Sequence, residues 1–147
     1  MREAEGARIA EDLKQRLQTI NNRIEKISEY STGLVEEYIV KLEERLKELL
    51  KTDVIDQTRL AQEVVIYSDK CSIQEELTRL NSHIEQFIKT IDTAKGPIGK
   101  NIDFLIQEMN REINTIGSKA NKLEITQTVV EVKTILEDIR EQVQNIE

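Results

Sequence analysis

Three side chains that could bind ligands or transfer protons lie at helical spacing in the middle of the sequence. Glu76, Arg79 and His83 are separated by three and four residues, which places them on one face if this stretch is helical. His83 is the only histidine, and imidazole is the side chain best suited to transfer protons near neutral pH. A lone histidine on a helix is more often packed or solvated than catalytic. The pattern therefore indicates a candidate acid–base site, with an ordinary solvated helix face as the alternative.

A second polar stretch, residues 96–122, is rich in asparagine. Asparagine is costly inside a helix because its side chain competes for backbone hydrogen bonds, so Asn110 and Asn114 indicate a role other than packing. From Lys95 to Lys122 there are five basic and three acidic residues, a net charge of +2 in a chain whose net charge is −7. Arginine, lysine and amide side chains bind phosphate oxygens, so this segment is the best candidate for contact with RNA.

Two carboxylates in the same stretch have a spacing that suits a metal ion. Glu108 and Glu112 are four residues apart, with Asp103 about a turn earlier. On one helix face such a pair can hold a hard divalent cation, with water completing its coordination. Many solvated helices carry glutamates at this spacing, so the pair alone is weak support for a metal site.

The elements that must position these side chains are expected to be helical. From Leu13 to Leu49 apolar residues recur every three or four positions, except that Ser31 occupies one place, and this heptad seam predicts a helix over residues 3–51. Such a helix would be about 75 Å long, far longer than a domain of this size. Either it has a kink or break near Tyr30–Gly33, where helix propensity is low, or its seam pairs with another chain.

Four further helices are expected after this one. Asp56 is a suitable N-cap for the first, and Ser72 with Glu75 has capping-box spacing at the start of the second. Gly96–Gly99 encloses the only proline and is expected to be the turn of a helical hairpin. The third helix follows this turn, and the fourth runs from about Leu123 to the end.

Composition agrees with an all-α fold. The chain is 38% hydrophobic, 33% charged and only 3% aromatic, with five glycines and one proline, which is too few aromatic and turn residues for a strand-rich domain. We predict a bundle of four or five helices, divided into a long helical arm over residues 1–52 and a bundle with the candidate site over residues 53–147. The net charge of −7 argues against nonspecific binding of nucleic acid over the whole surface.

The sequence also bears on location. It contains no apolar run of about eighteen residues and no signal-peptide core, so neither membrane insertion nor export is expected. The single cysteine, Cys71, cannot form an internal disulfide, which fits a reducing cytoplasm. A nucleophilic role for Cys71 is the less favoured interpretation.

Several blocks of sequence, taken in order, resemble the carboxy-terminal half of the YicC family. The blocks are Glu76–His83, Asp103–Glu108, Asn110–Glu112, Asn114–Thr115, Ser118–Lys119 and Ile139–Glu147, and Met1–Gly6 resembles the entry into this half. The resemblance implies a bacterial cytoplasmic endoribonuclease that needs a divalent metal, manganese or alternatively magnesium, and forms a ring-like homo-oligomer, a hexamer. Members of this family also carry a preceding, more strand-rich half. We therefore expect this chain to be part of a longer protein, and activity of the chain alone to be in doubt.

Within these blocks we assign roles by chemistry. Cleavage of RNA needs a base or metal to activate a hydroxyl or water, an acid for the leaving group, and positive charge near the phosphorane. The assignments are metal binding for Glu108 and Glu112, proton transfer for His83 with Glu76, phosphate contact for Arg79, Arg111 and Lys119, and RNA binding also for Lys100, Asn110, Asn114 and Ser118. The competing interpretation is structural: Glu76, Arg79, Arg111 and Glu112 would form an interhelical ion-pair network.

Three functions of different classes therefore remain open. The favoured one is a metal-dependent endoribonuclease that cleaves single-stranded or structured RNA, with RNA and copies of itself as partners and no DNA or membrane partner. The alternative is a non-catalytic module for oligomerisation and RNA binding, with the chemistry in the missing half. The third is a structural coiled-coil scaffold based on the seam from Leu13 to Leu49.

Overall fold

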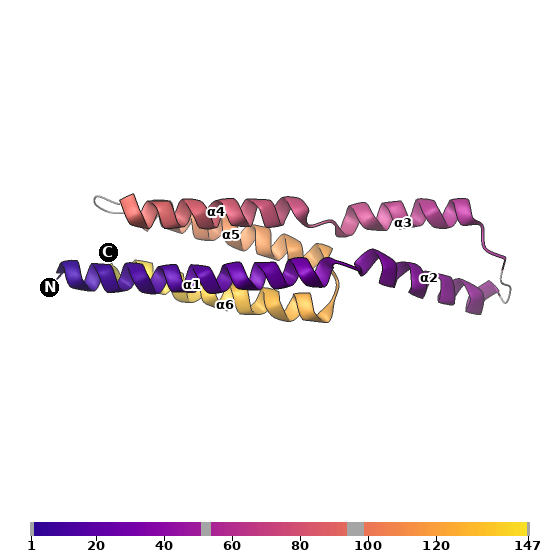
Figure 1. Ribbon diagram of the computed structural model, residues 1–147, viewed down its shortest axis with the longest axis horizontal. Helices are drawn as coiled ribbons and strands as arrows, with labels where there is room; N and C mark the ends of the chain where they lie inside the picture. The colour runs from indigo at the N-terminus through magenta and orange to yellow at the C-terminus, as the bar shows by residue number, and fades with distance from the viewer. Residues whose placement is uncertain (1, 51–53, 94–98, 147) are drawn as a thin grey trace.

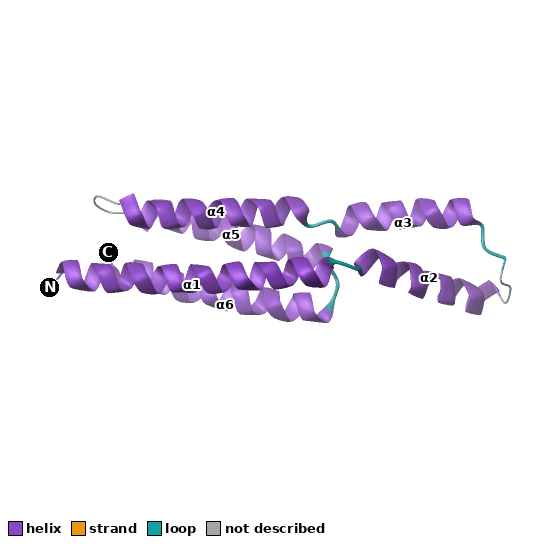
Figure 2. Cartoon of the chain, in the orientation of Figure 1, coloured by secondary structure: helices purple, strands orange, loops and turns teal. Residues whose placement is uncertain are grey.

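The computed structural model of the chain describes residues 2–50, 54–93 and 99–146, and all regular structure within these ranges is helical (Figure 2). The helices are α1 (Arg2–Ser31), α2 (Leu34–Leu50), α3 (Gln57–Cys71), α4 (Gln74–Thr93), α5 (Gly99–Lys119) and α6 (Leu123–Ile146). Only two residues separate α1 from α2, and two separate α3 from α4. Joined across these short breaks the six helices make four, so the predicted all-α bundle of four or five helices is confirmed.

Four of the helices, α1, α4, α5 and α6, form a closed bundle. Each packs against two others in the cyclic order α1, α4, α5, α6, and neighbours in this order run in opposite directions (Figure 1). The remaining two helices, α2 and α3, pack against each other and extend beyond one end of the bundle. In the structure the term arm is used for α2 and α3 together, and not for residues 1–52. The beginning of α1 and the end of α6 lie at the bundle end opposite the arm.

The heptad seam of α1 supplies one side of the bundle core. Its members are at most 3% exposed; they are Leu13, Leu17, Ile20, Ile24 and Ile27. Matching apolar stripes on α4, α5 and α6 face them, and the whole set forms one hydrophobic cluster. Burial of these stripes, rather than helix propensity alone, holds four amphipathic helices together.

The predicted break near Gly33 is confirmed, so residues 3–51 do not form one continuous helix. Gly33 has a φ of +93°, a conformation that side-chain-bearing residues rarely adopt. Its carbonyl accepts a hydrogen bond from the N–H of Glu37 at 2.9 Å, which starts α2 in a new direction. The glycine thus ends the bundle helix and begins the arm.

The helix starts that follow were predicted with mixed success. Asp56 is the N-cap of α3, as expected, and its carboxylate accepts from the backbone N–H groups of Thr58 and Arg59. The predicted capping box at Ser72 is wrong. The carbonyl of Ile73 accepts the N–H of Leu77, so Ile73 occupies the N-cap position of α4.

Two sequence predictions fall on residues outside the described ranges. The first is the predicted boundary between the helical arm and the bundle, at residues 52 and 53, which lies between α2 and α3. The hairpin turn at Gly96–Gly99 is the other, because only its last residue is described. On the two sides of this second gap, α4 and α5 pack closely and run antiparallel, as a helical hairpin requires.

The arm is packed much less completely than the bundle. Its helices meet through Tyr38 and Tyr67, whose rings stack with centroids 3.8 Å apart. Several of its large apolar side chains are about half exposed or more, namely Val40, Leu49, Leu50, Val65 and Ile66, with Val54 between the two helices. Across the described residues, no helix combines the length and apolarity needed to cross a membrane.

Candidate functional site

The candidate site lies along the edge where α4 and α5 face each other. The apolar stripes of both helices point into the bundle, and this fixes which polar residues stand at their common edge. From α4 these are Glu76, Arg79 and His83, and from α5 they are Glu108, Glu112 and Lys119. Because the helices are antiparallel, the beginning of α4 faces the end of α5, and the end of α4 faces the beginning of α5.

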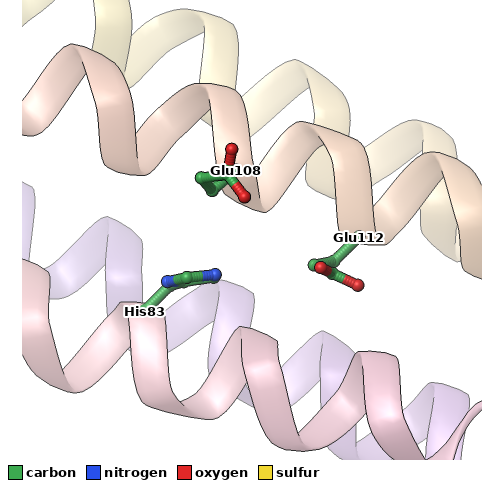
Figure 3. A group of neighbouring side chains, drawn as sticks. All are labelled: His83, Glu108 and Glu112. Atoms are coloured by element: carbon green, nitrogen blue, oxygen red, sulfur yellow. The ribbon is translucent and has the colours of Figure 1, made fainter.

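Two carboxylates and the histidine converge at the middle of this edge. One ligand atom from each of His83, Glu108 and Glu112 lies within 4.8 Å of the other two (Figure 3). Glu112 is buried with 5% of its surface exposed, whereas His83 and Glu108 are half-buried. The structure therefore brings together the glutamates that sequence analysis assigned to metal and the histidine that it assigned to proton transfer.

This group of three fits a divalent cation in chemistry and in size. Two carboxylates and one imidazole suit ions such as Mn²⁺, which accept both oxygen and nitrogen ligands. Opposite ligands of an ion with bonds of about 2.1 Å are about 4.2 Å apart, so small side-chain rotations would let the three atoms share one ion. In addition, Nδ1 of His83 is buried and makes no hydrogen bond within the part of the chain that the structure describes. A buried polar atom of this kind requires a partner.

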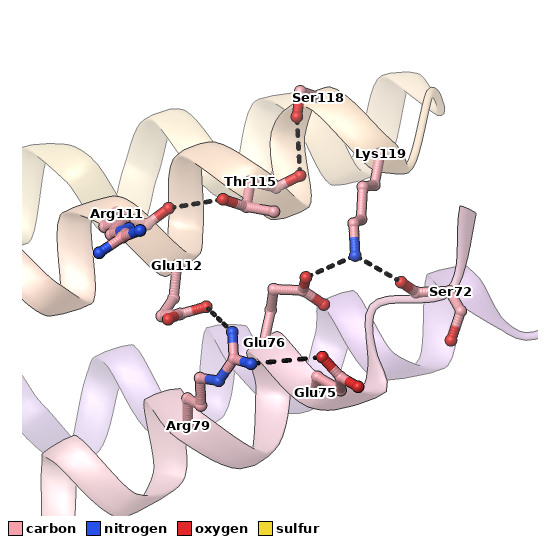
Figure 4. A network of polar contacts seen from close by, with 9 residues as sticks. All are labelled: Ser72, Glu75, Glu76, Arg79, Arg111, Glu112, Thr115, Ser118 and Lys119. Carbon is pink, nitrogen blue, oxygen red and sulfur yellow. Dashed lines mark hydrogen bonds and ion pairs between the residues drawn. The ribbon is translucent and has the colours of Figure 1, made fainter. Parts of the chain in front are cut away.

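Arg79 links the candidate metal ligands to the rest of α4. Its Nη1 lies 3.5 Å from Oε2 of Glu112, and its Nη2 lies 3.3 Å from Oε2 of Glu75 (Figure 4). The Arg79 side chain is 54% exposed, so these pairs add little to stability. Their effect is to hold the buried carboxylate of Glu112 from one side. The predicted interhelical ion pair is thus present for Arg79 and Glu112.

A second and more buried ion pair joins Glu76 to Lys119. Nζ of Lys119 lies 2.6 Å from Oε1 of Glu76 and also donates to the carbonyl of Ser72 at 3.4 Å (Figure 4). Only 4% of the Glu76 side chain is exposed, and its second oxygen, Oε2, is buried without a hydrogen-bond partner in the described residues. This pair ties the start of α4 to the end of α5.

The ion pair controls the ionisation of Glu76. Burial, the largest influence on this carboxyl, raises the pKa of Glu76. The hydrogen bond from Lys119, the bond from its own backbone N–H and the charges of Lys119 and Arg79 together outweigh burial, and they bring the pKa below its ordinary value of 4.5. Glu76 is therefore a carboxylate at neutral pH. Its assignment to proton transfer stays a prediction, as does the assignment of Lys119 to RNA binding.

Arg111 is not part of the ion-pair network, which corrects the structural interpretation of this residue. It is exposed, and its side chain makes no ion pair or hydrogen bond in the described residues. Its carbonyl accepts the hydroxyl of Thr115 (Figure 4). Asn114 and Ser118 are exposed at the next positions of the same helix face, and Ser118 donates to the carbonyl of Thr115. These three side chains form an open polar stripe beside the candidate metal ligands.

Two other residues assigned to RNA binding are placed less clearly. Asn110 is half-buried on α5, between the metal-ligand candidates in sequence. The side chain of Lys100 lies outside what the structure describes. The roles of both residues stay predictions.

Sequence analysis did not predict the convergence of His83 with Glu108 and Glu112. The spacing of residues on the two sides of the predicted hairpin turn contains the information needed to predict this convergence. If α4 and α5 turn about Pro97, residues equally far from Pro97 should face each other, and His83 and Glu112 are fourteen and fifteen residues away. The same count pairs Glu76 with Lys119.

Cys71 is placed unfavourably for nucleophilic chemistry. Its side chain is buried at the end of α3, and its Sγ contacts the carbonyl of Ser68 at 3.7 Å. Burial raises the pKa of the Cys71 thiol, which disfavours the reactive thiolate. This agrees with the sequence analysis, in which a nucleophilic role for Cys71 was the less favoured interpretation.

Comparison with known proteins gives consistent results. The sequence model of a family described as "Endoribonuclease YicC-like, C-terminal" matches residues 27–147. The chain is 55% identical over 148 residues to a protein of Clostridioides difficile named probable endoribonuclease YicC, a match that covers 100% of this chain and 50% of that protein. It is 31% identical over 147 residues to a protein of the same name from Haemophilus influenzae, again covering 100% of this chain and 50% of the relative. The chain thus spans about half the length of the curated relatives it matches.

Proposed function

The chain belongs to the YicC-like endoribonuclease family, and from this premise we propose that it carries the metal centre of an enzyme that cleaves RNA phosphodiester bonds. The observation that supports this most directly is the group formed by His83, Glu108 and Glu112 on the α4–α5 edge. It is the one place in the described residues where three potential ligands of the His, Cys, Asp and Glu types lie within 4.8 Å of one another.

The proposed ligands are the two carboxylates of α5 and the imidazole of α4. When bound, Mn²⁺, or Mg²⁺ in its place, supplies Lewis-acid stabilisation of negative charge on phosphate oxygens. Glu108 and Glu112 offer carboxylate oxygens that either ion accepts, and His83 adds a nitrogen, which favours Mn²⁺ over Mg²⁺. Arg79 keeps the carboxylate of Glu112 oriented through its 3.5 Å contact.

The open polar stripe of α5 is the proposed path of the RNA backbone. Arg111 has no partner for its guanidinium in the described residues, so its donors are available to a phosphate group. Asn114 and Ser118 add amide and hydroxyl groups on the same exposed face. Asn110, half-buried on α5, is the residue proposed to meet a sugar or a base edge.

The proposal is tested by removing ligands one at a time in a protein that contains this chain and the preceding half. We expect His83→Ala and Glu108→Gln to lower the rate of Mn²⁺-dependent cleavage of a labelled RNA by about 100-fold or more. Mn²⁺ binding measured by calorimetry should weaken in parallel. Glu85→Gln is the matched control, because Glu85 is exposed on α4 two residues from His83.

The outcomes separate the main alternatives. Full cleavage by both ligand variants would contradict the proposed centre. If the variants bind Mn²⁺ normally and the chain binds RNA while cleavage depends only on the preceding half, the chain is a binding module without chemistry of its own.

We further propose that the protein forms a ring-like homo-oligomer, a hexamer, and that the arm contributes to its contacts. The support is the concentration of exposed aliphatic side chains on the arm, among them Val65 and Ile66. Val65→Ser should lower the mass observed by analytical ultracentrifugation. Val130→Ser is its control, since Val130 is equally exposed on α6. An unchanged mass for Val65→Ser would exclude the arm as a contact surface.

We propose the cytoplasm as the site of action. The cysteine of the chain, Cys71, is a free thiol buried against its own helix. Such a residue needs no oxidising compartment, and RNA is the substrate that the family name implies.

A further inference from the structure

A groove lies between the second half of α4 and the beginning of α5, next to the candidate metal centre. The residues that line it from α4 are Gln86, Lys89, Thr90 and Thr93, and those that line it from α5 are Asn101, Phe104 and Leu105. Phe104 is four residues before Glu108, which places the two on neighbouring turns of one helix face. The groove and the metal centre are therefore consecutive positions along the same edge of the bundle.

Phe104 is the exposed apolar side chain of this groove, since Leu105, which also lines it, is buried. Phe104 is 59% exposed, whereas the other phenylalanine, Phe87, is fully buried in the core. Ile102 and Leu105 on either side of it are buried, so α5 is held in the bundle without help from Phe104. The ring is left with an open face at the groove.

Polar groups that lack protein partners surround this ring. The side chains of Gln86, Lys89 and Asn101 make no hydrogen bond or ion pair within the described ranges. The hydroxyl groups of Thr90 and Thr93 donate to carbonyls of their own helix, which leaves their oxygens free to accept. The groove thus offers an aromatic face, two amides and one ammonium group.

We propose that this groove binds an unpaired base of single-stranded RNA. The base stacks on Phe104, the amides of Gln86 and Asn101 meet its edge, and Lys89 meets a neighbouring phosphate. The inference rests on the proposed nuclease function and deepens it, since it makes an unpaired nucleotide beside the cleaved bond a requirement of the substrate. A base inside a duplex could not present its face to the ring.

The chemistry of the groove favours a nucleotide over a protein segment. A protein contact surface is typically a continuous aliphatic patch, as on the arm, where Val65 and Ile66 are exposed side by side. Here one aromatic ring is surrounded by amide, ammonium and hydroxyl groups. That combination is typical of proteins that recognise single strands.

Tryptophan fluorescence provides a direct test, because the chain contains no tryptophan. In Phe104→Trp the introduced indole is the sole such fluorophore, and we expect a single-stranded oligouridylate or oligoadenylate to quench it without added metal. A duplex of the same length and inorganic polyphosphate should leave the signal unchanged. Leu123→Trp, at an exposed position of α6, serves as the control and should not respond to any of these ligands.

Affinity measurements with two further variants complete the test. Phe104→Leu should weaken binding of the single strand by roughly tenfold or more, because stacking is lost, while Phe104→Tyr should bind like the original chain. Equal quenching by polyphosphate, or unchanged affinity in Phe104→Leu, would overturn the proposal. So would a change of oligomer mass in Phe104→Leu, which would identify the ring as a protein contact.

These readouts separate this inference from the nuclease proposal. If Phe104→Leu binds single strands normally and the enzyme still cleaves, the base site is wrong and the metal centre stands. If quenching occurs as expected but His83→Ala cleaves normally, the base site stands and the metal centre is wrong.

Discussion

The bundle and the arm use the same apolar spacing but bury it to very different degrees. In α1 the seam residues Leu17 and Ile20 are completely buried, whereas in α2 Leu46 is half-buried and Leu49 is 64% exposed. Two helices of the closed bundle, α4 and α6, pack against α1, whereas α3 is the one helix that packs extensively against α2. Periodicity therefore identifies a helix and its apolar face, but the number of neighbours decides how much that face stabilises the fold.

The largest expected effect is on stability, and it tests this comparison directly. Leu17→Ala in the bundle should lower the free energy of unfolding by about 2–5 kcal/mol, since a cavity remains in a closed core. Leu46→Ala in the arm should cost clearly less, about 1 kcal/mol, because water can reach the site. Urea denaturation at low protein concentration measures both. Equal losses would mean that the arm is as well packed as the bundle.

The next effect concerns the buried ion pair of the bundle. Glu76→Gln should lower the free energy of unfolding by about 1–3 kcal/mol at neutral pH, because it leaves Lys119 without its anion. Glu75→Gln, which removes an exposed carboxylate from the same turn, should cost less than about 0.5 kcal/mol. The two values compare a buried pair with a surface pair on one helix.

The same pair predicts a pH dependence whose sign follows from the lowered pKa of Glu76. A carboxyl with a depressed pKa in the fold contributes stability that is complete above its unfolded value, near 4.5, and is lost as the pH falls through the folded value. The difference between the original chain and Glu76→Gln should be constant from about pH 7 to pH 5 and shrink below pH 4.5. Denaturation curves over this range measure it. A difference that grows on acidification would contradict the assignment.

The smallest effect is expected at the junction between the two regions. Gly33→Ala should destabilise the fold by about 1–2 kcal/mol, since alanine is strained at a φ of +93° although no atom lies within 4 Å of the new methyl group. Gly6→Ala adds a methyl group in equally open space within α1, and it should raise stability by up to about 1 kcal/mol. Thermal melts of both variants should shift in opposite directions. If both variants shifted the melting temperature in the same direction, the backbone conformation of Gly33 would not be what determines the break between α1 and α2.

Local patterns in the sequence were enough to predict the helices and the break between α1 and α2. The seam, the cap at Asp56 and the weak helix propensity near Gly33 act over a few residues, so each can be recognised without knowing the fold. Ser72 was misassigned because its spacing to Glu75 satisfies a local rule, while the packing of Ile73 into the core decides where α4 begins.

The candidate site was predicted as a list of residues but not as an arrangement. The pair of Glu108 and Glu112 lies within one helix, so its spacing could be read from sequence. The position of His83 opposite them depends on the register between α4 and α5, which core packing sets over some twenty residues on each side of the turn. Arg111 illustrates the same point. Its charge suggested an ion pair, but it lies on a face of α5 that is exposed to solvent.

The order of the helices around the bundle also implies an order of folding. α4, α5 and α6 are consecutive in the chain, and each packs on the next after a short connection. α1 also packs against α4, but the whole arm lies between these two helices in the sequence. The connection from α1 to α4 has about eight times as many residues as the connection from α4 to α5. The longer connection adds about 2 kcal/mol of closure entropy. We therefore expect the α4–α5 hairpin, with the candidate ligands on it, to form before α1 docks, so that α1 completes the core as the last and slowest step.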